Sequence, residues 1–156
     1  MISISDYSDK YAYEWNNFLT GAINGSFLFN RSYMDYHKDR FVDQSFMVHN
    51  DSKLIALIPG NQKENQWFSH SGLTYGGIII QKDSPEILLK IIEQFEALLR
   101  EKNIDSASFT LMPSPYKKFY FESDLYALIS SGYKILGADL HQFIFSVKSL
   151  PNKKVS

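Results

Sequence analysis

Hydrophobic residues recur at every third or fourth position between residues 84 and 103, which is the spacing of an amphipathic helix. Ser84 is a suitable N-cap, and Pro85 suits the first helical position because an N–H there would have no helical partner. Asn103 suits the left-handed position after the last turn, and Ile104 can close that cap. The predicted apolar stripe consists of Leu88, Ile91, Ile92, Phe95, Leu98 and Leu99.

Three shorter stretches also carry helical signals. Residues 9–19 place apolar side chains on one face before Gly21, which predicts a first helix. Ser32 is a reasonable N-cap for a helical turn over 32–36, with Asp35 in its first turn. A further helix is predicted over 122–131, where Gly132 ends it.

Strand-like runs lie between these helices. Residues 46–48 and 54–58 flank a polar turn and predict a hairpin, and the wholly apolar second run predicts a central strand buried on both faces. Residues 61–66 are polar and predict a loop. Further strands are predicted over 75–80, over 107–112 and, in one or two pieces around Gly137, over 135–147.

The order of these elements predicts the fold class. A helix that connects two strands favours a parallel crossover, whereas the hairpin is antiparallel, so we expect a mixed sheet. The predicted architecture is therefore an α/β (α+β) three-layer sandwich, with a mixed central β-sheet flanked by helices. We expect one domain over residues 1–150, and a tail or the start of a linker over 151–156.

Composition narrows the classes of function. The chain has 156 residues, of which 44% are hydrophobic, so it can bury a sizeable core. Its net charge is −1 and its basic residues are scattered, which argues against nucleic acid as a partner. There are no cysteines, no signal segment and no run of about 18 apolar residues. We therefore expect a cytoplasmic protein that does not insert into membranes.

The stretch 69–77 gathers small and polar residues just before an apolar strand, so it is the main candidate site. His70 is a candidate general base, or it contacts substrate, or it holds the loop in shape. The phenol of Tyr75 is a candidate proton donor, with simple packing as the alternative. Ser71, Gly76 and Gly77 are candidate substrate-binding residues, although the two glycines also suit a β-bulge.

A second polar cluster follows the first predicted helices. His37 and Arg40 are candidate substrate-binding residues, and Arg40 either pairs with a carboxylate or contacts an anionic acceptor. Asp35 and Asp39 lie nearby, but the spacing matches no strong metal-ligand pattern, so no metal is expected. Lys117 and Lys118 beside Tyr116 suggest a solvated loop.

Several short strings, taken in order, resemble the GNAT-type N-acyltransferase fold, and in particular its FemAB-like branch, whose members contain two GNAT-like halves. The resemblance covers most of the chain. The strings are Trp15-Asn16-Asn17-Phe18, Gly25-Ser26-Phe27-Leu28, Tyr33-Met34-Asp35-Tyr36-His37, Asp39-Arg40-Phe41, Leu57-Ile58-Pro59-Gly60-Asn61, Ser69-His70-Ser71-Gly72-Leu73-Thr74-Tyr75-Gly76-Gly77 and Asp124-Leu125-Tyr126-Ala127-Leu128.

The resemblance implies transfer of an acyl group, from acyl-CoA or an aminoacyl donor, to an amine of a cell-wall or polysaccharide precursor. The chain departs from the family at the loop that holds the CoA diphosphate in complete GNAT domains. The corresponding residues 81–86 contain no glycine, and Pro85 offers no N–H to a phosphate. We therefore expect the chain to be the N-terminal, acceptor-side half of a two-domain enzyme, inactive by itself, with no cofactor bound by this half.

The expected partners are the second GNAT-like half and a small-molecule amine or sugar acceptor. An apolar face left without that half could also form a homodimer. Two other functions stay open from the sequence. One is a non-catalytic module that binds a sugar or a peptidoglycan precursor, and the other is a self-sufficient small GNAT acetyltransferase with an atypical donor loop.

Overall fold

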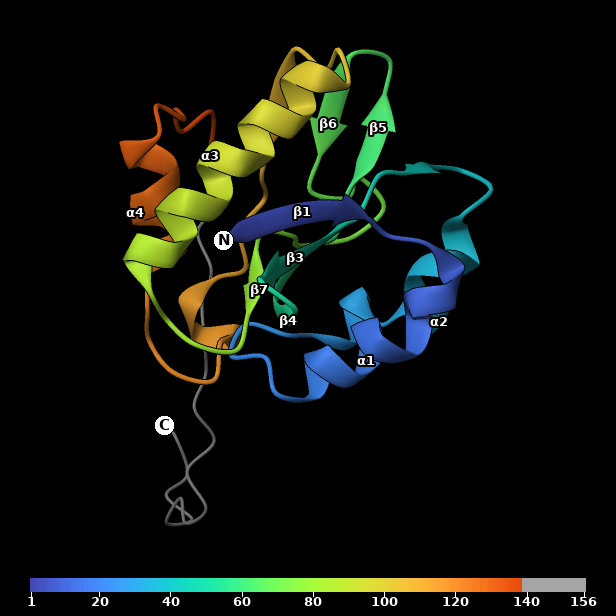
Figure 1. Cartoon of the computed structure of the whole chain (residues 1–156), viewed down its shortest axis with the longest axis horizontal. Coiled ribbons are helices and arrows are strands. Elements are labelled where there is room, and N and C mark those ends of the chain that lie inside the picture. Colours follow the sequence, from blue (N-terminus) through green and yellow to red (C-terminus); the bar gives the residue numbers. More distant parts are fainter. Residues whose placement is uncertain (139–156) are drawn as a thin grey trace, which may run out of the picture.

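The computed structural model describes residues 1–138, which form helices packed on two small sheets (Figure 1). The first sheet has the strand order β1-β3-β4-β7, and the second has the order β2-β5-β6-β8. The strands are β1 (Ile2–Asp6), β2 (Val42–Asp43), β3 (Phe46–Asn50), β4 (Lys53–Ile58), β5 (Asn61–Lys63), β6 (Gln66–Phe68), β7 (Ile79–Ile80) and β8 (Ser106–Ser108). The α-helices are α1 (Ala12–Thr20), α2 (Arg31–Met34), α3 (Pro85–Glu101) and α4 (Ser123–Ser130).

The first sheet is covered on both faces, which confirms the predicted α+β sandwich. Helices α3 and α4 lie on one side of it, and α1 and α2 lie on the other (Figure 1). The side chains of β4 alternate accordingly: Ala56 and Ile58 join the core beneath α3, whereas Leu57 joins the core beneath α1. All three are fully buried, so the prediction of a central strand buried on both faces is confirmed.

Helix α3 confirms the strongest prediction from the sequence. The Ser84 side chain accepts a hydrogen bond from the Ile87 N–H, and Pro85 is the first helical residue. At the other end Asn103 has φ +57°, and the Ile104 N–H donates to the Leu99 carbonyl at 2.9 Å. The stripe residues Leu88, Ile91, Ile92, Phe95 and Leu99 are buried.

The first sheet also contains a strand that the predicted order lacked. Strand β1 pairs antiparallel with β3, with Ile4 opposite Val48. It lies beside the predicted β3–β4 hairpin. In the second sheet, the predicted loop over 61–66 is wrong. Strands β5 and β6 form a hairpin there, with Glu64 at φ +54° in the turn.

An isolated parallel bridge, Gly76 to Leu111, joins the chain just before β7 to the chain just after β8, on either side of the crossover through α3. The predicted strands over 75–80 and 107–112 are therefore present, but regular pairing is confined to β7 and β8. Beyond the bridge the two segments no longer pair, and 114–116 turns into a 3-10 helix.

The remaining helical predictions are close. Helix α1 follows a 3-10 turn over Asp9–Tyr11, and α4 ends before Gly132 at φ +94°. The predicted N-cap Ser32 is wrong, because the Asn30 side chain caps α2 by accepting from the Ser32 N–H. The strand-like run over 135–147 is irregular up to residue 138 and otherwise lies outside the described residues. Within the described part, no helix combines the length and the apolar character needed to cross a bilayer.

Candidate functional site

A short segment from the N-terminal half, the wedge formed by residues 23 and 24, covers the outer edge of β7. The Ile23 N–H donates to the Ile80 carbonyl at 2.8 Å. The Asn24 side chain completes the pairing: its Nδ2 donates to the Ile78 carbonyl at 2.8 Å, and its Oδ1 accepts from the Ile80 N–H at 2.9 Å. One buried side chain thus replaces a neighbouring strand, and these β7 groups have no hydrogen bonds left for an extended ligand.

The wedge is held from its other side as well. The Lys118 N–H donates to the Ile23 carbonyl at 2.8 Å. The segment 23–24 therefore fills the gap that opens where the β7 segment and the chain after Leu111 diverge. The four residues that follow it, 25–28, are brought to the mouth of that gap.

A pocket of about 390 Å³ lies at this mouth. Gly25, Ser26, Phe27 and Leu28 contribute to its lining from the segment after the wedge. The rest of the lining comes from Thr74, Tyr75, Met112 and Tyr116, on either side of the Gly76–Leu111 bridge.

The base of the pocket belongs to the core beneath α1. Leu28 and Met112 are buried members of that core, and Tyr75 packs against it. Phe27, by contrast, is 72% exposed and packs edge to face on Tyr33 with ring centroids 5.4 Å apart. The pocket therefore runs from an exposed aromatic rim to a buried apolar base.

Tyr75 and Tyr116 pair across the pocket. Their ring centroids lie 5.7 Å apart at an interplanar angle of 34°. Burial raises the pKa of the Tyr75 phenol above its ordinary value of 10, and the charge and hydrogen bond of the Tyr116 phenol raise it further. The Tyr75 phenol stays protonated at neutral pH, as tyrosines ordinarily do, and the raised pKa makes it a weaker acid than a free tyrosine.

The two glycines after Tyr75 have backbone roles: Gly76 allows another backbone segment to approach closely, and Gly77 adopts a positive φ. The Gly76 N–H donates to the Thr110 carbonyl at 2.7 Å, and a Cβ at Gly76 would overlap the Ser69 carbonyl oxygen. Gly77 has φ +113°, a conformation that favours glycine. Both are buried and outside the pocket lining, so the close approach that their sequence indicated is made by Ser69 and Thr110.

His70 lies behind this loop and outside the pocket lining. It is 6% exposed, has φ +68°, and its ring packs edge to face on Phe41 with centroids 5.4 Å apart. Its Nδ1 accepts from the Gly72 N–H at 3.3 Å, and its carbonyl accepts from the Leu73 N–H at 3.0 Å. These contacts shape the turn that leads to Tyr75.

The other predicted site residues are dispersed. Ser71 is exposed, and its N–H donates to Asn61 Oδ1 at 2.6 Å. Arg40 is exposed, and His37 ends the short 3-10 helix Asp35–His37. Neither Ser71 nor Arg40 lines the pocket, so the structure brings Tyr75 to it without these two predicted residues.

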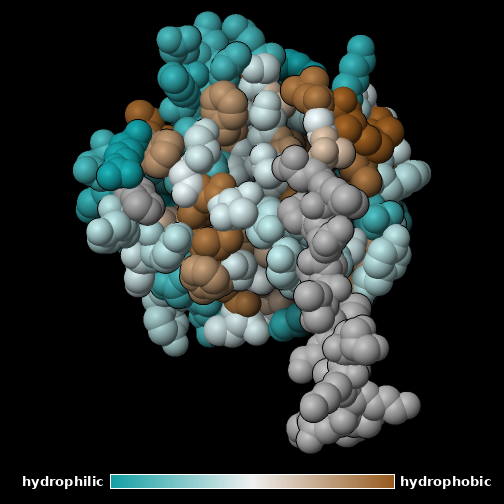
Figure 2. Space-filling view, turned by 180° about the vertical axis from the view of Figure 1, so that it is seen from behind, coloured by the Kyte–Doolittle hydropathy of each residue, from teal (hydrophilic) through white to brown (hydrophobic). Residues whose placement is uncertain are grey.

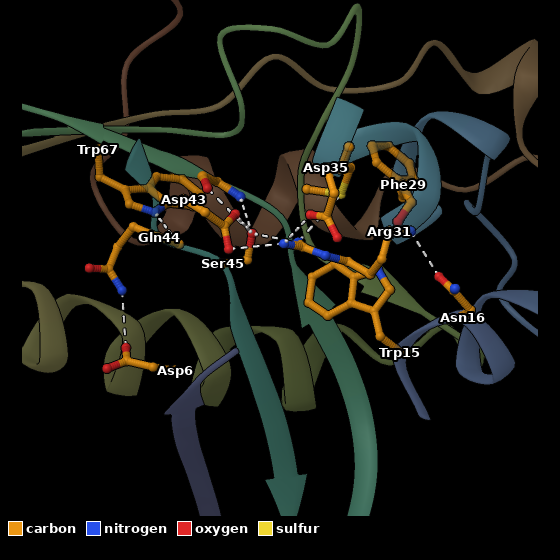
Figure 3. A network of polar contacts seen from close by, with 12 residues as sticks. Asp6, Trp15, Asn16, Phe29, Arg31, Asp35, Asp43, Gln44, Ser45 and Trp67 are labelled. Atoms are coloured by element: carbon orange, nitrogen blue, oxygen red, sulfur yellow. Dashed lines mark hydrogen bonds and ion pairs between the residues drawn. The ribbon is translucent and has the colours of Figure 1, made fainter. Parts of the chain in front are cut away.

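Sequence reasoning missed Arg31. This residue forms ion pairs with two carboxylates that lie close to Arg40 in the sequence. Its side chain is 3% exposed and donates to Asp35 at 3.1 Å and to Asp43 at 3.0 Å (Figure 3). It also lies 3.7 Å from the centroid of the Tyr7 ring. This network joins α2 to β2 and the start of the chain, and Figure 3 shows it among buried aromatic side chains.

The predicted solvated loop at 117–118 is wrong for Lys117. Its Nζ donates to both carboxylate oxygens of Asp124 at 3.2 and 3.1 Å and to the Phe121 carbonyl at 3.0 Å. The pair is buried, so Asp124 is a partner for Lys117 as well as a first-turn residue of α4. Tyr116, in the same string, faces the pocket.

No three histidine or carboxylate side chains within 1–138 cluster closely enough to hold a metal ion. In the loop 81–86, Gln81 Nε2 donates to the Phe18 carbonyl at 2.9 Å, and Pro85 offers no N–H. No family model matches the chain, and no curated protein gives a match.

Proposed function

We propose that this chain is the acceptor-side half of a FemAB-like N-acyltransferase, and that its substrate site is the Tyr75 pocket. The observation that carries the proposal is the convergence at one pocket of two strings, 25–28 and 69–77, that resemble this family. Most of the pocket is made by these two segments, which lie far apart in sequence. We place the protein in the cytoplasm, where CoA thioesters are available.

In the proposed reaction an acceptor amine attacks the thioester carbonyl of an acyl-CoA. The new C–N bond forms, the C–S bond breaks, and the amine loses a proton while the CoA thiolate gains one. Tyr75 is assigned the proton transfer to the thiolate, because its phenol lines the pocket and is protonated at neutral pH. Burial favours a positioning role for His70, as the residue that holds the turn before Tyr75.

The acyl-CoA is proposed to bind mainly to a second GNAT-like half. Two observations support this division. The edge of β7 is paired with Ile23 and Asn24, and the loop 81–86 has no glycine and no N–H at Pro85 for a diphosphate. Both features disfavour a self-sufficient acetyltransferase with its donor on this chain.

An apolar surface supports a contact with such a half. Exposed apolar side chains gather over α4 and the chain that follows it, at the upper right of Figure 2. They include Tyr126, Ile129, Ile135 and Leu136, each 49% exposed or more. Patches of this kind commonly mark protein interfaces. In the absence of the second half, the same surface is proposed to form a homodimer.

The first experiment is a calorimetric titration of this chain with acetyl-CoA. We expect affinity weaker than about millimolar. Tighter binding would overturn the assignment of the donor to another half. The reading frame of the gene is expected to continue for about 150 residues, roughly one further domain.

The second experiment assays the full-length product with acyl-CoA and a panel of amines, by following release of the free CoA thiol. Tyr75→Phe is expected to lower kcat at least about tenfold, the low end of the usual contribution of general acids. Tyr13→Phe, at an exposed tyrosine outside both the pocket and the apolar surface, is the control. No thiol release with any acceptor would contradict the proposed function, and an unchanged kcat in Tyr75→Phe would remove the role of Tyr75.

One observation favours a non-catalytic binding module as the second candidate. Among the described residues that line the pocket there is no histidine, carboxylate or lysine to act as a base. A binding module predicts a ligand that binds at the pocket with no turnover in any form of the protein. Equilibrium binding and thiol release, measured on the same full-length sample, separate the two functions.

A further inference from the structure

We infer that the Tyr75 pocket holds a linear alkyl chain and not a sugar ring or a charged group. The inference deepens the proposed function, since it rests on the choice of this pocket as the substrate site. It concerns equilibrium binding, however, and its test needs no turnover.

The lining carries no formal charge within the described residues. Its side chains are aromatic or aliphatic, apart from the hydroxyls of Ser26 and Thr74 and the two phenols. Burying a carboxylate or a phosphate against such a surface is strongly unfavourable without a paired cation. The pocket therefore disfavours the anionic groups of nucleotides and acids.

Several polar groups of the turn over residues 26–30, beside the pocket, hydrogen-bond to one another. The Ser26 hydroxyl accepts from the Leu28 N–H at 3.2 Å, and the Ser26 carbonyl accepts from the Phe29 N–H at 3.0 Å. The Phe27 carbonyl accepts from the Asn30 N–H at 3.1 Å. A sugar hydroxyl buried against the apolar side chains of this lining would lose its water without gaining a partner, which is unfavourable. An alkyl chain buries none.

The volume and the lining of the pocket also suit an alkyl chain. The volume of about 390 Å³ lies within the range of about 300–1,000 Å³ found for small-ligand pockets. Flexible Met112 lies at the buried base, and the exposed Phe27 ring lies at the rim. Methionine adapts to irregular apolar ligands, and apolar cavities take up apolar molecules readily.

The test is a calorimetric titration of the chain with straight-chain alcohols of four, six and eight carbons. Affinity is expected to rise about fourfold for each added CH₂, the factor expected when every methylene is buried. N-acetylglucosamine is the sugar probe and is expected not to bind. Affinity that does not depend on chain length, or binding of the sugar in place of the alcohols, would overturn the inference.

A pair of exposed substitutions locates the binding. Thr74 is an exposed residue of the lining, so Thr74→Glu adds a charge to the pocket without disturbing the core. We expect Thr74→Glu to weaken 1-octanol binding at least tenfold and Thr74→Val to preserve it. Ser71→Glu adds the same charge at an exposed position outside the lining and should have no effect. Equal binding to Thr74→Glu and to the unsubstituted chain would place the alcohol elsewhere and overturn the inference.

Two further ligands distinguish the sources of the chain. Octanoyl-CoA represents the acyl group of a donor, and octylamine represents the alkyl part of an acceptor. Whichever binds more tightly than 1-octanol, with the same sensitivity to Thr74→Glu, identifies the source. If neither binds as tightly as 1-octanol, the pocket does not serve either substrate of the proposed reaction, although the chain itself still binds there.

Discussion

The Nζ atom of Lys117 lies 3.1 Å from Oδ2 of Asp124, and the two side chains are 3% and 5% exposed. The third partner of this ammonium group is the Phe121 carbonyl. The pair therefore ties the chain between the pocket and α4 to the first turn of that helix. Within residues 1–138 its charges meet each other, neighbouring backbone groups and the Phe121 ring, whose centroid lies 4.1 Å from Nζ.

Removing one member of this pair should be costly. Lys117→Met leaves a buried carboxylate without its cation, so we expect a loss of about 3–5 kcal/mol in the free energy of unfolding. The double variant Lys117→Met/Asp124→Leu should recover most of the loss, because no unpaired charge remains. Urea denaturation of both variants measures this. A double variant as unstable as the single one would show that the pair contributes through its geometry and not through charge compensation.

Gly76→Ala should destabilise the chain by steric overlap with the Ser69 carbonyl. This part of the loop is backbone packed on backbone, which cannot yield as a flexible side chain can. We expect a loss of about 1–3 kcal/mol or more in unfolding free energy. Gly137→Ala is the matched control, since a Cβ there meets open space, and it should change stability by less than about 0.5 kcal/mol. Equal stability of the two variants would contradict the close approach at Gly76.

Asn24→Ala should weaken the whole β7 edge. It leaves the Ile78 carbonyl and the Ile80 N–H without that side-chain partner, and an unpaired buried group costs about 1–3 kcal/mol. Asn24→Asp should be at least as harmful, because it replaces the donor to the Ile78 carbonyl with a buried carboxylate that repels that carbonyl. Asn17→Ala, an exposed change on α1, is the control. Thermal or urea unfolding that ranks Asn24→Ala with Asn17→Ala would refute the role of the wedge.

Tyr133 should make stability fall at alkaline pH. Burial raises the pKa of this phenol and the Glu96 carboxylate raises it further, with Arg100 partly opposing them. The unfolded chain keeps a pKa near 10, so above that pH it loses a proton that the folded chain retains. The folded state is then disfavoured, by at most about 1.4 kcal/mol per pH unit until the folded pKa is passed.

Tyr133→Phe removes this titration and should reduce the loss of stability between pH 10 and pH 11. Urea midpoints measured across this range test the expectation. Tyr13→Phe, which replaces a tyrosine that is 84% exposed, should leave the pH dependence unchanged. If both variants follow the unsubstituted chain, the alkaline loss arises from other groups.

The elements that the sequence predicted well are those whose signals are local. Helix α3 has its cap at Ser84, its stripe and its left-handed Asn103 within one continuous stretch. Strand β1 was not predicted, because its alternation of apolar and polar residues is short and its partner β3 lies more than forty residues away. The β5–β6 hairpin was predicted as a loop, because its residues are mostly polar. The strand pair is held to the core by the buried Trp67.

The site was predicted in part for a similar reason. Tyr75 lies in the glycine-rich string that attracted attention, and it does line the pocket. Met112 and Tyr116 reach the pocket because the chain diverges after the Leu111 bridge, which is a long-range event. Lys117 looked solvated because its burial depends on Asp124, and no local pattern announces that pairing. The string 25–28 was the one signal that could have indicated the opposite side of the pocket.

The wedge at Ile23 and Asn24 makes the pocket depend on contacts between segments that are far apart in the sequence. Its hydrogen bonds run to β7 on one side and to Lys118 on the other, so the lining assembles only when β7 and the chain around Lys118 are both in place. Local opening of the wedge would dismantle the pocket and also withdraw Ile23 from the core beneath α3. A bound ligand would therefore slow amide hydrogen exchange at Ile23 and Ile80 and raise the melting temperature with its concentration.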